Sequence, residues 1–210
     1  MTVLGIAAAG LLAGVLHVYL GPDHLAALAV LSLRAPSRAW RLGFRWGLGH
    51  AAGVLAVAAL VFSFRGLFEV DRLSHAGEIL VGITLIVLGL WGLWRARPNV
   101  ETTDDPRHAH GRAAFLVGTL HGAAGTSHLL GILPSLALPS HALALVYLGA
   151  FSLATVAAMA FFSGFLGIVG RRSDEHRGRR AGWMIRSASV VSILVGIAWI
   201  VLPTAGISLP

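Results

Sequence analysis

The chain has 210 residues, of which 56% are hydrophobic and 12% are charged, and its formal net charge is +7. Soluble domains are typically about 25% charged, so this composition argues against a soluble globular domain and is typical of an integral membrane protein. The chain has no cysteine. That absence excludes disulfides, thiolate metal sites and dithiol redox chemistry, and leaves imidazole and carboxylate as the strong metal ligands.

Six apolar runs follow one another along the chain, each long enough to cross a bilayer, which takes roughly 20 helical residues. They cover residues 3–33 (broken at 21–22), 42–64, 75–94, 113–133, 140–168 and 184–203. We therefore expect six transmembrane helices.

The basic residues indicate how these helices are oriented. All 16 are arginines, and 14 of them lie in or beside the first, third and fifth connections. The positive-inside rule places that side in the cytoplasm and both termini outside, in a multi-pass protein of the cell inner membrane. Because the arginines fit a topology signal, we expect the lipid bilayer as a partner and no nucleic acid.

A histidine motif occurs twice in the chain. The pattern Gly-x-Leu-His-x-x-x-Gly-x-x-His-Leu begins at Gly14 and again at Gly118, and a second similarity relates 79–83 to 193–197. Repeated units with an odd number of spans insert in opposite orientations, and their equivalent broken helices surround one midplane site. The predicted fold is therefore an all-α integral membrane protein with six transmembrane helices in two inverted three-helix repeats. The repeats cover 1–97 and 112–210, with a cytoplasmic linker at 98–111.

The first copy of the motif holds the strongest candidate site. Proline breaks a helix, so Gly21-Pro22 predicts a break directly before Asp23 and His24. His50 lies within a glycine-rich stretch of the second span, where small residues permit close helix approach. Ionisable side chains inside a membrane are functional candidates by default. The predicted metal ligands are His17, Asp23, His24, His50, His121 and His128.

The predicted ligands limit which metal ions the site can bind. Neutral imidazoles with a carboxylate and no thiolate suit Ni²⁺, Co²⁺, Zn²⁺ or Cu²⁺. Mg²⁺ and Ca²⁺ prefer sites made entirely of oxygen, so both are disfavoured.

Two segments resemble a known family. Gly14-Val-Leu-His17 followed by Gly-Pro-Asp23-His24-Leu-Ala-Ala-Leu-Ala resembles the first-helix signature of the nickel/cobalt transporter family. The segment His121-Gly-Ala-Ala-Gly-Thr resembles the small urease-accessory permease branch. The resemblance implies a polytopic permease for Ni²⁺ or Co²⁺, with the histidines and aspartate of the first motif as ligands. The spacing from His17 to Asp23 is one residue longer than in the family pattern.

We therefore predict transmembrane transport of Ni²⁺ or Co²⁺, with no enzymatic activity and no tightly bound cofactor. One alternative is a six-helix b-type cytochrome with histidine axial ligands. Another is an exporter of a small anion such as sulfite. An intramembrane metalloprotease is not expected, because the chain lacks a His-Glu-x-x-His motif.

Overall fold

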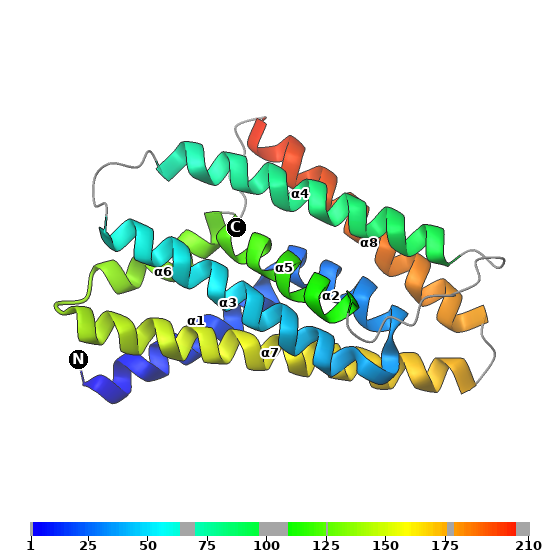
Figure 1. The fold of residues 1–210 in the computed structure, drawn as a ribbon, viewed down its shortest axis with the longest axis horizontal. Helices are drawn as coiled ribbons and strands as arrows, with labels where there is room; N and C mark the ends of the chain where they lie inside the picture. Colours follow the sequence, from blue (N-terminus) through cyan, green and yellow to red (C-terminus); the bar gives the residue numbers. More distant parts are fainter. Residues whose placement is uncertain (1, 64–69, 97–108, 125, 176–178, 205–210) are drawn as a thin grey trace.

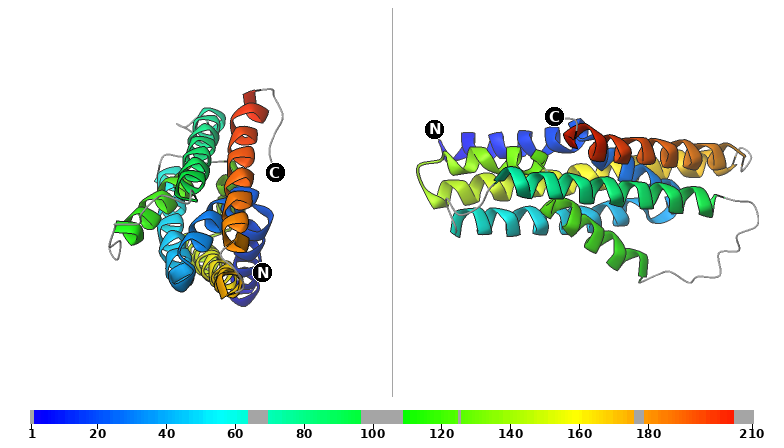
Figure 2. Two further views of the ribbon diagram at one scale, coloured as in Figure 1. Left: turned by 90° about the vertical axis from the view of Figure 1, so that its right-hand side faces the viewer. Right: turned by 90° about the horizontal axis from the view of Figure 1, so that it is seen from above.

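The computed structural model describes residues 2–63, 70–96, 109–124, 126–175 and 179–204, and within these residues the chain is helical, without strands. Most helices run along the long axis of the molecule, whereas α5 diverges from it at an angle (Figures 1 and 2). In chain order the elements are α1 (Val3–Leu20), α2 (Pro22–Arg34), the 3-10 turn η1 (Pro36–Arg38), α3 (Ala39–Ser63), α4 (Val70–Arg95), α5 (Ala109–Ala123), α6 (Thr126–Leu136), α7 (His141–Glu175) and α8 (Arg179–Thr204).

Much of the described chain is long and apolar enough to cross a membrane, as the composition predicts. Five such stretches are found among the described residues: Val3–Leu20, Pro36–Ser63, Ala76–Arg95, His141–Arg172 and Gly182–Pro203. They correspond to five of the six predicted runs. The predicted run 113–133 instead contains most of α5 and most of α6, which have 15 and 11 residues. Each is shorter than the roughly 20 residues of a membrane-crossing helix.

The predicted break at Gly21-Pro22 is confirmed. Helix α1 ends at Leu20, Gly21 is extended with φ −86° and ψ 98°, and Pro22 is the first residue of α2. Proline has no N–H to continue α1, and its fixed φ suits the first position of a new helix. Asp23 thereby lies in the first turn of α2. A negative side chain there is stabilised by the positive end of the helix dipole.

Glycines allow helices from distant parts of the sequence to approach closely. Helix α3 packs along α5, and α1 packs along α7. A Cβ atom on Gly118 or Gly122 of α5 would collide with the carbonyl oxygens of Trp46 or His50 in α3. Small residues at such crossings let two backbones come into contact. The contact brings the middle of α3 against the C-terminal half of α5.

Helices α4 and α8 lie side by side and form a second close crossing (Figure 1). A Cβ atom on Gly82 would lie 2.6 Å from the carbonyl oxygen of Gly196, and a Cβ on Gly196 would lie 2.6 Å from that of Gly82. Ser192 donates a hydrogen bond of 2.8 Å to the carbonyl oxygen of Leu85 across the same interface. Neither glycine therefore has room for a side chain unless the helices separate.

This crossing predicts that Gly82→Ala destabilises the protein. Forcing a methyl group into a tightly packed contact typically costs about 1–3 kcal/mol. Gly149→Ala on α7 is the matched control, because a Cβ there meets nothing within 4 Å. Thermal unfolding of both purified variants should show a lower midpoint for Gly82→Ala and an unchanged or higher one for Gly149→Ala. Equal midpoints would mean that the α4–α8 contact is not tight.

Candidate metal centre

Five of the six predicted ligands come together inside the helix bundle, from four different helices. His17 lies in α1, Asp23 and His24 in α2, His50 in α3 and His121 in α5. Among the described residues they form two possible metal-binding groups, His17–His24–His50 and Asp23–His24–His121, with ligand atoms within 4.8 Å of one another in each. The sixth predicted ligand, His128, belongs to α6, but its side chain lies outside the described residues.

Asp23 links the two parts of this cluster. Its Oδ1 accepts a hydrogen bond of 2.9 Å from Nδ1 of His24, and its Oδ2 accepts one of 2.9 Å from Nε2 of His121. Asp23 and His121 are each 2% exposed, and His24 is fully buried. A carboxylate in apolar surroundings is costly unless it is paired, and here each oxygen has an imidazole partner. Asp23 thus joins α2 to α5.

His17 and His50 make the second contact of the cluster. Their Nε2 atoms lie 3.2 Å apart, a distance that lets one neutral imidazole donate to the other. His24 stands edge-on to both, with ring centroids 4.6 Å from His17 and 4.9 Å from His50. His50 is fully buried, whereas His17 is half-buried. His24 therefore lies between the His17–His50 contact and Asp23.

Large aromatic side chains form the apolar wall of the cluster. The ring of Trp46 lies 5.7 Å from that of His121, and the ring of Phe151 lies 5.3 Å from that of His17. Trp46 is fully buried and Phe151 is 1% exposed. Such walls keep the local dielectric low, which strengthens the attraction between a cation and Asp23.

The arrangement offers imidazole nitrogens and one carboxylate within reach of a single ion. Asp23 hydrogen-bonds one ring nitrogen of His24 and one of His121, which fixes the orientation of both rings. A neutral imidazole can carry its proton on either ring nitrogen, so the nitrogens that face Asp23 can instead bind a cation held beside the carboxylate. The cluster can therefore hold a first-row divalent cation without a thiolate.

Sequence reasoning did not identify all the residues that shape this region. Trp46 and Phe151 line the cluster, yet aromatic residues within apolar spans give no signal of that role. Among the buried side chains of the whole described chain, Glu78 of α4 is a second carboxylate, 7% exposed. It belongs to neither metal-binding group found among the described residues. The sequence marks Glu78 as a candidate for burial only because it is an acidic residue within an apolar run.

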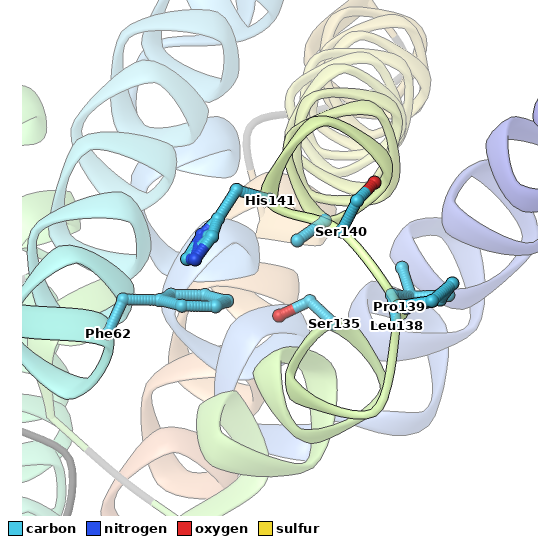
Figure 3. Close-up of a pocket in the computed structure, with 7 residues that line it drawn as sticks. Phe62, Ser135, Leu138, Pro139, Ser140 and His141 are labelled. Carbon is cyan, nitrogen blue, oxygen red and sulfur yellow. The ribbon is translucent and has the colours of Figure 1, made fainter.

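A hollow elsewhere in the molecule is a poor candidate for the same chemistry. Figure 3 shows it at the end of α3 and the turn between α6 and α7. His141 and Phe62 face each other there with ring centroids 6.0 Å apart. Its lining residues are Phe62, Ser135, Leu138, Pro139, Ser140, His141 and Ala144. One imidazole and no carboxylate do not make a transition-metal site.

Two curated plant proteins are similar to nearly the whole chain. "Chloroplast protein FOR GROWTH AND FERTILITY 2" of Arabidopsis thaliana is 35% identical over 220 residues, which cover 99% of this chain and 59% of that protein. "Chloroplast protein FOR GROWTH AND FERTILITY 1" of the same plant is 32% identical over 219 residues, which cover 95% of this chain and 60% of that protein. The chain thus spans about three fifths of the length of these relatives.

The remaining comparisons give no match. No family model matches the chain. No solved structure matches it either. The names of the two plant relatives state a chloroplast location and a role in growth and fertility, and they specify no substrate.

The geometry predicts that Asp23 stabilises the metal-free protein. Asp23→Ala removes the acceptor of His24 and of His121, and each buried donor that loses its partner costs about 1–3 kcal/mol. Asp23→Asn should cost less, because its carbonyl oxygen can still accept from one of the two rings. Thermal unfolding in the presence of a chelator measures both effects. An Asp23→Ala variant as stable as the wild type would contradict this role.

Proposed function

We propose that this protein is a membrane permease that carries a divalent transition-metal ion, Ni²⁺ or Co²⁺, through the His/Asp cluster. The observation that carries the proposal is the contact between Asp23, His24 and His121, all buried, in a chain rich in apolar helices. Intramembrane ionisable residues that pair with one another mark ion pathways. The metal is cargo in this proposal, and no resident cofactor is required.

The donor set supports this class of ion. Imidazoles suit Ni²⁺ and Co²⁺, whereas Mg²⁺ and Ca²⁺ prefer oxygen ligands. Transport also requires release, and three protein ligands bind an ion less completely than the four-ligand cages of structural metal sites. Each group in the cluster offers three ligands. The resemblance of the first motif to the nickel/cobalt transporter signature agrees with this choice.

Two inverted repeats with six spans are part of the proposal. In this arrangement α5 and α6 together form a broken span equivalent to α1 and α2. The matched glycines support it: a Cβ on Gly14 would collide with the carbonyl oxygen of Phe151, and one on Gly118 with that of Trp46. Trp46 and Phe151 are therefore equivalent positions in the two proposed repeats, because each packs against the matched glycine of the other repeat. The reciprocal contact of Gly82 with Gly196 also fits, because equivalent residues near a two-fold axis meet each other.

The orientation in the membrane is supported by aromatic and basic residues together. Trp40, Trp94 and Trp183 are at least half exposed, with values of 53%, 50% and 66%, and each lies near an arginine-rich connection. Tryptophans gather at membrane–water interfaces, and arginines mark the cytoplasmic side. We propose a cytoplasmic arginine-rich side and outer termini. The cell inner membrane remains our proposed location, and the chloroplast named for the relatives would also provide a bilayer for the same site.

The alternatives fit the cluster less well. A haem would have to lie between two axial imidazoles, but His17 and His50 are in direct contact at 3.2 Å. An anion such as sulfite would meet the carboxylate of Asp23 at close range, and like charges repel strongly in a low dielectric.

Transport assays with one conservative variant test the proposal. Asp23→Asn keeps the side-chain volume but removes the charge, so accumulation or export of Ni²⁺ and Co²⁺ should fall at least about tenfold, the lower range for disturbed metal sites. His141→Gln is the control, because His141 is exposed and outside the cluster. Cells expressing each variant at equal membrane levels are compared by metal content. Wild-type transport by Asp23→Asn would contradict the metal-site proposal.

A further inference from the structure

The cluster is organised as two sets of three ligands that share one histidine. The first set, His17, His24 and His50, consists only of imidazoles and comes from α1, α2 and α3. The second set contains Asp23, His24 and His121, and it comes from α2 and α5. The first set includes half-buried His17, whereas every member of the second set is buried.

We infer that the cluster provides two alternative positions for the transported ion, and that His24 remains a ligand while the ion passes from one position to the other. This inference rests on the proposed function, because it describes how the same cluster handles its cargo. In the imidazole-only position the ion is bound by His17, His24 and His50. The carboxylate position holds it between the two halves of the chain.

The geometry favours two positions over one site with five ligands. Nitrogen and oxygen ligands lie about 2.0–2.2 Å from a zinc-sized divalent ion, so two ligands of one ion are at most about 4.4 Å apart. The ligand atoms satisfy nearly that spacing within each set of three, where all lie within 4.8 Å of one another. At that spacing the five residues form two groups that share His24, and not one group of five. Small movements suffice to close either set around an ion.

The two positions differ in charge, so the ion binds one of them more favourably than the other. Three neutral imidazoles leave both positive charges of the ion without compensation in buried surroundings. Asp23 compensates one of these charges in the second position, and the attraction is strong at low dielectric. The ion therefore resides longer beside Asp23 than in the imidazole position.

His24 is suited to be the shared ligand. In the metal-free protein Asp23 positions its ring through the hydrogen bond of 2.9 Å to Nδ1, and the rings of His17, His50 and His121 all lie within 4.9 Å of it, centroid to centroid. An ion held by His24 can exchange its other ligands one at a time. Exchange in steps avoids the full dehydration and release of the ion inside the membrane.

Co²⁺ binding to the purified full-length protein in detergent tests this inference, with the visible absorption of Co²⁺ as the readout. His50→Gln removes the first position, His121→Gln removes the second, and His24→Gln removes both. Each of the first two variants should bind Co²⁺ within about tenfold of the wild-type affinity, while the double variant and His24→Gln should lose about 100-fold or more. His141→Gln is the control and should bind like the wild type.

The spectra and transport assays separate this inference from simpler schemes. The wild-type spectrum should contain two Co²⁺ components, and each single variant should retain one of them. Both single variants should lose transport although they still bind Co²⁺, because the transfer needs both positions. If either single variant abolishes binding as fully as the double variant, or if both variants still transport, the inference is wrong.

Replacement variants and the wild-type result separate failure of this inference from failure of the proposed function. If His50→Gln does not fold, His17→Gln removes the same position, and Asp23→Asn replaces His121→Gln in the same way. A wild-type protein that binds neither Co²⁺ nor Ni²⁺ would contradict the proposed function itself. A wild-type protein that binds Co²⁺ through a single component would overturn only the two-position inference.

Discussion

The structure depends on the hydrogen bonds to one buried carboxylate. Asp23 lies at 2% exposure among apolar helices, where an unpaired charge would be very costly. Both of its oxygens accept hydrogen bonds from imidazoles, and one of those, His121, is 98 residues away in the sequence. The break at Gly21-Pro22 brings Asp23 into the first turn of α2, and α5 supplies the second partner. The contact thus joins α2 to α5, two helices that lie in different predicted spans.

Close helix packing makes that contact possible. Gly118 and Gly122 allow the backbone of α5 to touch the backbone of α3 at Trp46 and His50. A larger side chain at either glycine would separate the helices and move His121 away from His50. Membrane helices gain little from burying apolar surface against lipid, so such small-residue contacts contribute much of their association. The same glycines that stabilise the fold therefore also determine the spacing of the proposed metal ligands.

Local signals explain what the sequence could predict. A proline in an apolar run predicts a break wherever it occurs, and the break at Pro22 is confirmed. Histidines and an aspartate in apolar runs stand out chemically, so His17, Asp23, His24, His50 and His121 could be selected without knowledge of the fold. The division of 113–133 into α5 and α6 was harder to predict, because glycines weaken a helix far less than proline does. The bond from Asp23 to His121 and the grouping around His24 depend on which helix faces meet, and no local pattern specifies that.

We propose above all that this cluster binds a divalent transition-metal ion through histidine. X-ray absorption at the nickel edge tests it most directly, on purified full-length protein loaded with one equivalent of Ni²⁺ and freed of unbound ion. We expect the protein to retain Ni²⁺ with nitrogen and oxygen neighbours and with the outer-shell scattering of several imidazoles. Asp23→Asn should change this spectrum, and His141→Gln should leave it unchanged. Loss of the ion during washing, or a spectrum without imidazole scattering, would contradict histidine-mediated metal binding by this cluster.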